Sequence, residues 1–227
     1  MTDPLKLAIF DVDGTLVDSQ NHIYAAIAHA FADTPFPCPD RAAVLSIVGL
    51  SLPEAFAVLV PEADAAANAM LVDRYKSSFA SAREGGTVLS PLYPGALDAL
   101  DTLGAVDDIL LGVATGKSRR GLNHVLATHN LAGRFVTEQV SDHHPSKPHP
   151  SMLLAALSET GVDERQAVMI GDTEFDIAMA HAAGLRSIAV AWGYHSADRL
   201  EAAKPDAIIH AYGELIPTLN AIWGEEI

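Results

Sequence analysis

The stretch Asp11-Val12-Asp13-Gly14-Thr15 directly follows the apolar run Leu7-Ala8-Ile9-Phe10 and guides the interpretation of the whole chain. A short apolar run that ends at a turn signal is typical of a buried strand. Two carboxylates at the end of such a strand are costly to bury unless a cation meets them. In open α/β sheets, ligands bind beyond the carboxyl ends of the strands. The stretch therefore indicates a metal site, a nucleophile or both, although a lone Asp-Gly pair is more often a plain turn.

Six segments have the pattern of buried strands, and helical patterns separate the later ones. This alternation predicts an α/β fold with a Rossmann-like parallel sheet as its core. The predicted strands are Leu5–Phe10, Ile109–Ala114, Phe135–Val140, Ala167–Ile170, Ser187–Ala191 and Ala207–Ile209. The predicted helices among them are Ser118–Leu131, Ser151–Thr160 and Glu174–Ala183, and a glycine follows the end of each.

The segment between the first two predicted strands shows only helical periodicity. An apolar stripe begins at Ile23, Ser51-Leu52-Pro53-Glu54 has the form of a capping box, and Glu62–Ala82 is Ala-rich and ends before Gly85-Gly86. Such an insert is far longer than an ordinary crossover connection. We therefore expect an inserted α-helical cap domain at residues 18–87, and an α/β core formed by residues 1–17 and 88–227.

Composition limits the partners and the location that we expect. The chain has 227 residues, of which 49% are hydrophobic, as in a globular protein. Its formal net charge is -15, so its surface repels nucleic-acid phosphates and anionic lipid, and we expect neither as a partner. No apolar run approaches the ~20 residues of a membrane helix, and we expect no signal peptide. The single cysteine, Cys38, excludes an internal disulfide and predicts a cytoplasmic location.

Residues that can bind a metal ion or phosphate follow four of the predicted strands. They are Asp11 and Asp13 after the first, Thr115 and Gly116 after the second, Lys147 after the third, and Asp172 and Asp176 after the fourth. Because parallel strands end at one edge of a sheet, we expect these residues to converge. Carboxylate oxygens suit Mg²⁺, which keeps water and phosphate oxygens among its ligands. A carboxylate at such a site can act as a nucleophile and form an acyl phosphate.

Four segments resemble, in order along the chain, the four motifs of haloacid dehalogenase-like hydrolases. They are Asp11-Val12-Asp13-Gly14-Thr15, Thr115-Gly116, Lys147-Pro148 and Gly171-Asp172-Thr173-Glu174-Phe175-Asp176. The helical insert is similar to the helical cap of that superfamily. Leu7 to Ser19, Gly49-Leu50-Ser51-Leu52 and Asp172 to Gly184 are most similar to its phosphoglycolate phosphatase branch. The resemblance covers essentially the whole chain.

The resemblance implies roles for the acidic residues. Asp11 is expected to be the nucleophile and a metal ligand. Asp13 is expected to protonate the leaving alcohol and then activate water, while its backbone carbonyl contacts the metal. Asp172 is expected to complete the metal site. Asp176 is expected either to bind the metal or to support its ligands, although a residue in the first turn of a helix can also be favoured by the helix dipole.

The remaining motif residues are expected to bind phosphate. The resemblance implies that Thr115 and the backbone amide of Gly116 bind the phosphoryl oxygens. It also implies that Lys147 orients the nucleophile and the phosphate. Gly116 stands where many relatives carry Asn, so only its amide is expected to contribute. Two structural alternatives stay open: Thr115 could cap the helix that begins near Ser118, and Lys147 could be a solvated loop residue.

The sequence therefore predicts a Mg²⁺-dependent phosphatase that hydrolyses small, phosphoglycolate-like phosphomonoesters through an aspartyl phosphate. We expect a small phosphorylated metabolite as its partner and a monomer or homodimer. A sugar-phosphate mutase of the same superfamily is the alternative, and a non-catalytic phosphate-binding protein comes third. Asp13 argues against a dehalogenase, because only an alcohol leaving group needs a second Asp. Candidates to meet a substrate carboxylate in the cap are Arg41, Arg74, Lys76 and Arg83.

Overall fold

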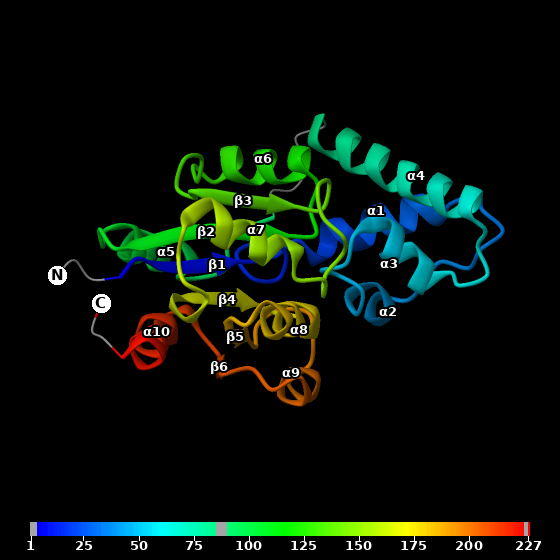
Figure 1. Ribbon diagram of the computed structural model, residues 1–227. Coiled ribbons are helices and arrows are strands. Elements are labelled where there is room, and N and C mark those ends of the chain that lie inside the picture. Colours follow the sequence, from blue (N-terminus) through cyan, green and yellow to red (C-terminus); the bar gives the residue numbers. More distant parts are fainter. Residues whose placement is uncertain (1–3, 85–89, 225–226) are drawn as a thin grey trace.

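The computed structural model describes residues 4–84, 90–224 and 227. At its centre lies a six-stranded parallel sheet with the strand order β3-β2-β1-β4-β5-β6 (Figure 1). The strands are β1 (Lys6–Phe10), β2 (Ile109–Thr115), β3 (Thr137–Val140), β4 (Ala167–Gly171), β5 (Arg186–Val190) and β6 (Ala207–Ile209). The predicted strands are all confirmed, with small shifts at their ends. The chain moves from one side of β1 to the other between β3 and β4, so the crevice for ligands lies beside β1.

Helices cover both faces of the sheet. One face carries α5 (Ala96–Gly104), α6 (Arg119–Thr128) and α10 (Leu215–Trp223). The other carries α7 (Ser151–Thr160) and α8 (Glu174–Ala183), and α9 (Ala197–Ala203) packs beside α8. In β1, Ala8 and Phe10 belong to the first hydrophobic cluster, whereas Leu7 and Ile9 belong to the second. Burial on both faces explains why this strand is a continuous apolar run rather than an alternating one.

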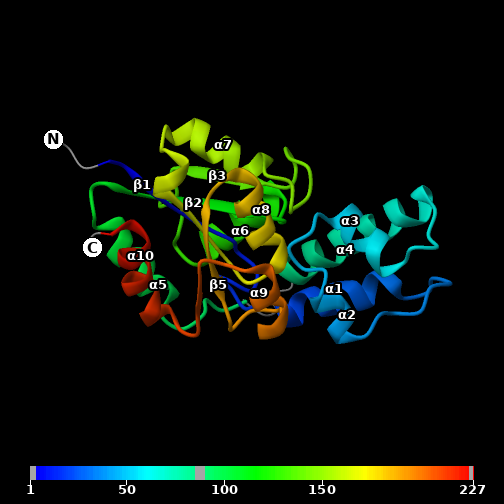
Figure 2. The same ribbon diagram turned by 60° about the horizontal axis from the view of Figure 1, so that its bottom comes forward.

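The segment between β1 and α5 folds into helices with a hydrophobic core of their own. They are α1 (Gln20–Phe31), α2 (Arg41–Leu45), α3 (Leu52–Leu59) and α4 (Ala65–Glu84). Ile23, Ile27, Phe56 and Leu71 lie at the centre of that core. Figures 1 and 2 show these helices beyond the carboxyl ends of the strands. The expected insertion of a helical cap into a parallel α/β core is confirmed.

Two neighbouring segments connect the cap helices to the core. Val17 and Leu92 form an antiparallel bridge, and the amide of Asp18 donates to the carbonyl of Pro91 at 2.9 Å. The division at residues 17/18 and 87/88 stays a prediction, and its second boundary lies outside the described residues, as does the predicted break at Gly85-Gly86. No helix in the described part of the chain is both long enough and apolar enough to span a membrane.

The predicted capping box at Ser51-Leu52-Pro53-Glu54 is wrong, although α3 does begin at Leu52. Ser51 occupies the N-cap position without a side-chain capping bond. In a capping box, the carboxylate of Glu54 accepts from the amide of Ser51. That amide instead donates to the hydroxyl of Ser146 at 2.8 Å. The start of α3 is therefore tied to the core loop that carries Lys147.

Candidate active site

The predicted site residues converge at the carboxyl edge of the sheet. Asp11 follows β1, Asp172 follows β4, and Asp176 lies in the first turn of α8. The carboxylates of these residues are buried and offer oxygens that all lie within 4.8 Å of one another. The side chain of Asp13 is not part of this cluster. The structure therefore brings the first and fourth motifs together around one acidic centre.

Lys147 is the cation buried in this cluster. Its ammonium lies 3.1 Å from Oδ2 of Asp11 and 2.6 Å from Oδ1 of Asp176. Burial alone lowers the pKa of Lys147, but the charges of Asp11 and Asp176 outweigh it, so that the pKa is raised and the group stays charged. The reading of Lys147 as a solvated loop lysine is wrong, since its side chain is fully buried.

The carboxylates outnumber the cations in this centre. Burial raises the pKa of Asp11 to about 7, against the opposing attraction of Lys147. Burial and the neighbouring carboxylates also raise the pKa of Asp172 well above its usual value. When all three carboxylates of the cluster are ionised, they and the one ammonium leave an excess of two negative charges. A divalent cation would neutralise that excess, and hard oxygen donors suit such an ion.

Asp172 is held firmly in place. Its Oδ1 accepts from the hydroxyl of Thr15 at 2.9 Å, and its Oδ2 accepts from the amide of Tyr194 at 2.9 Å. A Cβ atom at Gly14 would lie 2.1 Å from Oδ2 of Asp172, and one at Gly193 would lie 2.1 Å from its Cβ. Both glycines are therefore required for this carboxylate to fit between the two loops.

Asp176 has both of its carboxylate oxygens engaged. Oδ1 accepts from Lys147, whereas Oδ2 accepts from the amide of Thr173 at 3.1 Å and from its hydroxyl at 2.7 Å. Thr173 is the N-cap of α8, and it forms a capping box with Asp176. Of the two predicted roles, this geometry favours support of Lys147 and the loop over direct metal binding.

Asp13 lies beside the acidic cluster and has partners that sequence reasoning missed. Its Oδ1 accepts from the ammonium of Lys117 at 2.8 Å and from the hydroxyl of Ser19. The hydroxyl of Tyr194 lies 3.0 Å from the Ser19 hydroxyl and accepts from the Ser19 amide at 2.9 Å. Lys117 directly follows Thr115-Gly116 at the carboxyl end of β2, and this position in the sequence could have indicated it as a site residue. Tyr194 lies in the loop that follows β5, and this loop begins at the same carboxyl edge of the sheet.

Neither Ser19 nor Thr115 caps a helix with its side chain, so the capping role considered for Thr115 is wrong. Ser19 occupies the N-cap position of α1, but its side chain makes no capping bond and contacts Asp13 instead. Ser118 caps α6 by accepting from the amide of Gly121 at 3.2 Å. Thr115 is therefore free of that task, and its hydroxyl accepts from the amide of Lys117 at 3.2 Å.

The absence of a side chain at Gly116 has a physical reason. A Cβ atom there would lie 2.7 Å from the carbonyl oxygen of Gly49 and 3.0 Å from that of Leu50. Both carbonyls belong to the cap segment between α2 and α3. A larger residue would push this segment away from the core. Gly116 thus allows the cap to approach the site closely.

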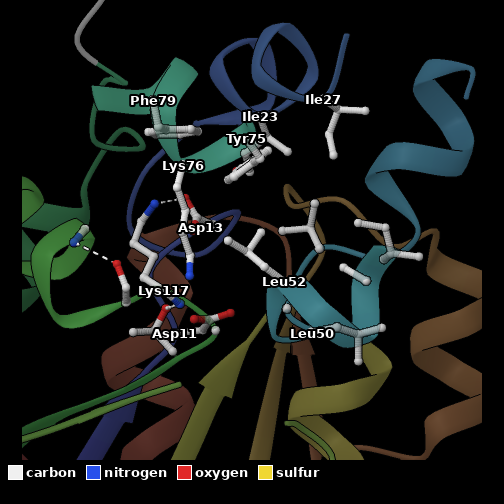
Figure 3. A pocket seen from close by; sticks show the side chains of 18 of the residues that line it. Asp11, Asp13, Ile23, Ile27, Leu50, Leu52, Tyr75, Lys76, Phe79 and Lys117 are labelled. Carbon is white, nitrogen blue, oxygen red and sulfur yellow. Dashed lines mark hydrogen bonds and ion pairs between the residues drawn. The ribbon is translucent and has the colours of Figure 1, made fainter. Parts of the chain in front are cut away.

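A cavity of about 200 Å³ lies between the cap and the core (Figure 3). Asp11, Asp13, Thr115 and Lys117 line it from the core side. Of the cap cations considered from the sequence, Lys76 lines it as well. The residues predicted to act as the nucleophile, the second carboxylate and the phosphate-binding groups thus line one cavity, and their roles stay predictions.

The close approach of Gly14 to Asp172 leads to a stability prediction, for which Gly133 serves as the control. We expect Gly14→Ala to lower the free energy of unfolding by at least about 2 kcal/mol more than Gly133→Ala, because overpacking adds to backbone strain. Both glycines have a φ of +80°, but a Cβ at Gly133 meets nothing within 4 Å. Gly133→Ala therefore measures the strain alone. Urea unfolding of both variants checks the difference, and equal losses would contradict a close fit at Asp172.

Comparisons with known proteins give a consistent result. A family model described as haloacid dehalogenase-like hydrolase matches residues 8–190. "Probable phosphatase IndB" of Dickeya dadantii (strain 3937) is 36% identical over 222 residues, which cover 95% of this chain and 94% of that protein. Phosphoglycolate phosphatase of Yersinia pseudotuberculosis serotype I (strain IP32953) is 29% identical, and the match covers 93% of this chain and 91% of that protein. The solved structure of a haloacid dehalogenase-like hydrolase from Streptococcus pneumoniae matches with a TM-score of 0.81 at 26% identity. The match covers 94% of this chain and 98% of that protein.

Proposed function

The chain belongs to the haloacid dehalogenase-like hydrolases, and we propose that it is a Mg²⁺-dependent phosphatase of small phosphomonoesters. Relatives that match over nearly the whole chain carry the name phosphatase. The observation that supports the proposal most directly is the placement of Asp11. Its carboxylate is buried beside Lys147 within a cluster that has excess negative charge, and it lines the cavity between the cap and the core.

The first proposed step is phosphoryl transfer to Asp11. A carboxylate oxygen of Asp11 attacks phosphorus and forms an acyl phosphate, while the bond from phosphorus to the alcohol oxygen breaks. Asp13 donates a proton to that oxygen, so a neutral alcohol leaves. In the second step, Asp13 takes a proton from water, whose oxygen attacks the phosphorus, while the bond between phosphorus and the carboxylate oxygen of Asp11 breaks. Inorganic phosphate is released, and both carboxyl groups return to their starting states.

The surrounding residues orient and neutralise the reacting groups. Lys147 holds Asp11, and we propose that Thr115 and the amide of Gly116 bind the phosphoryl oxygens. Lys117 and Ser19 fix the carboxyl group of Asp13 where it can reach the leaving oxygen. Bound by Asp11, Asp172 and the carbonyl of Asp13, Mg²⁺ would supply positive charge against the phosphoryl group. Asp176 supports Lys147 in this scheme.

The cavity helps to rank the alternatives. A sugar-phosphate mutase must bind sugar hydroxyl groups in its cap. Here the cap contributes mostly apolar side chains to the cavity, which offer such groups no partners. We therefore rank phosphatase activity first. The partner in this proposal is a small phosphorylated metabolite, and a cytoplasmic monomer or homodimer stays a prediction.

Metal dependence provides the direct test of this function. With an aryl phosphate as substrate, we expect excess chelator to reduce phosphate release by at least about a hundredfold, and added Mg²⁺ to restore it. Without the ion, the excess charge at Asp11 and Asp172 is not neutralised. Colorimetric assay of released phosphate provides the measurement. Equal rates with and without chelator would exclude the proposed metal role, and no release from any phosphate would exclude the phosphatase itself.

The same ion should stabilise the fold in a pH-dependent manner. The folded-state pKa of Asp11 is about 7, above the unfolded value of 3.8, so this group disfavours folding progressively as the pH rises between those values. A divalent ion binds the deprotonated carboxylate and removes that penalty. We therefore expect the increase in Tm caused by Mg²⁺ to be larger at a pH above 7 than near pH 5. Thermal unfolding with and without Mg²⁺ at both values checks this expectation.

A further inference from the structure

The cavity has two chemically different ends. Its core side presents Asp11, Asp13, Thr115 and Lys117, where the proposed chemistry takes place. Its cap side is apolar: apart from Lys76 and Gly49, every cap residue that lines it carries an aliphatic or aromatic side chain. Figure 3 labels Ile23, Ile27, Leu50, Leu52, Tyr75 and Phe79 among them. A substrate with its phosphoryl group at Asp11 therefore meets this apolar surface with the rest of its body.

The positive charges at the cavity lie toward its phosphate end. Lys117 is paired with Asp13 at 2.8 Å. Lys76 points from α4 into the cavity, toward Asp13 and Asp11 (Figure 3). Arg120 lines the cavity from the core side, and its side chain is exposed to solvent. Lys117 also lies 5.7 Å from the centroid of the Phe79 ring, at the edge of the apolar surface. Among the described residues, Lys76 is the one Lys or Arg that the cap contributes to the cavity lining.

The other cap arginines that were considered from the sequence do not reach the cavity. Arg41 donates to Oε1 of Gln20 at 2.9 Å and to Oδ1 of Asn21 at 2.7 Å on an exposed surface. Arg74 donates to the carbonyl of Ala32, and neither arginine lines the cavity. The side chain of Arg83 lies outside the described residues. A carboxylate on the leaving alcohol would therefore lose its water against an apolar wall, which is costly.

From this arrangement we infer that the cavity selects phosphomonoesters of apolar alcohols, branched alkyl or aromatic, and discriminates against carboxylated ones such as phosphoglycolate. The inference rests on the proposed phosphatase function and names its substrate class. Each methylene group that moves from water onto the apolar wall should raise kcat/KM by about fourfold. The cavity volume of about 200 Å³ favours a small alcohol.

A matched pair of substrates tests this inference on the unaltered protein. Isobutyl phosphate and phosphoglycolate have nearly the same shape, because two methyl groups of the first replace two carboxylate oxygens of the second. We expect kcat/KM for isobutyl phosphate to be at least about tenfold higher. An equal or higher value for phosphoglycolate would overturn the inference but leave the phosphatase intact. Hydrolysis of neither, nor of any other phosphate, would refute the proposed function on which the inference depends.

Two variants of the same helix locate the source of selectivity. Leu52 lies at the start of α3 and lines the cavity, whereas Val58 lies on the outside of α3 and is 59% exposed. We expect Leu52→Lys to shift the ratio of kcat/KM toward phosphoglycolate by at least about tenfold, because it supplies a cation to the wall. Val58→Lys adds the same charge elsewhere and should leave the ratio unchanged. The same ratio in both variants would contradict selection by the apolar wall.

A variant of Lys76 tests whether this residue binds the phosphoryl group of the substrate or a substrate carboxylate. If Lys76 serves the phosphoryl group, Lys76→Met lowers kcat/KM for isobutyl phosphate and phosphoglycolate by the same factor, as we expect. A loss confined to phosphoglycolate would show that Lys76 binds a substrate carboxylate and would overturn the inference. The comparison uses ratios within one variant, so it does not depend on the amount of active protein.

Discussion

Asp11→Asn is expected to lower turnover by at least about a thousandfold while the protein stays folded. An amide oxygen is a far weaker nucleophile than a carboxylate, so the acyl phosphate on residue 11 should not form. Asparagine has nearly the same shape, and its oxygen can still accept from the amide of Val12, which donates to Asp11 at 2.6 Å. Lys147 keeps its contact with Asp176 at 2.6 Å. The variant therefore removes the proposed nucleophile without leaving a buried charge unpaired.

A control and a second readout make this experiment decisive. Asp73→Asn removes the same charge from an exposed position on α4 and should keep wild-type turnover. Circular dichroism and thermal unfolding check that both variants are folded. Acid quenching during turnover, followed by mass spectrometry, should find phosphate on Asp11 in the wild-type protein and none in Asp11→Asn. Turnover at the wild-type rate in Asp11→Asn would remove Asp11 from the mechanism.

The sheet and the convergence of its motif residues could be predicted because local sequence determines both. β1 is buried on both faces, so it is apolar throughout, and the chain marks its end with Asp11. Parallel strands then place their carboxyl ends on one edge, whatever the details of packing. This rule brings together Asp11 and Asp172, which are far apart in the sequence, without any knowledge of the side chains between them.

Contacts between distant segments could not be predicted in this way. The amide of Ser51 is taken by Ser146, which no local pattern around Ser51 indicates. The hydroxyl of Ser19 contacts Asp13 and lies 3.0 Å from the hydroxyl of Tyr194, which is distant in the sequence. An apolar side chain such as Leu52 has the same sequence signal whether it fills a core or lines a cavity. The substrate class, which depends on that difference, therefore becomes accessible only from the three-dimensional arrangement.

Lys147→Met is expected to produce the largest loss of stability, together with loss of activity. The ammonium of Lys147 is buried between Asp11 and Asp176, at 3.1 and 2.6 Å. Methionine has a similar length but no charge, so both carboxylates would stay buried without their cation. Removing one partner of a buried ion pair typically costs roughly 3–5 kcal/mol, and we expect a loss of that size without divalent ions. Urea unfolding in chelator gives the value.

Lys117→Met is the matched control for this variant, because Lys117 also pairs with a site carboxylate at the same edge of the sheet. Its partner is Asp13 at 2.8 Å, and the two side chains are 12% and 13% exposed, whereas those of Lys147 and Asp176 are fully buried. We expect this variant to lose less stability than Lys147→Met, because water can reach the carboxylate of Asp13 when its cation is removed. Mg²⁺ should return part of the stability lost in Lys147→Met, since it places positive charge beside the same carboxylates. Equal losses of stability in the two lysine variants would contradict the expectation that burial makes the loss of the Lys147 ammonium more costly.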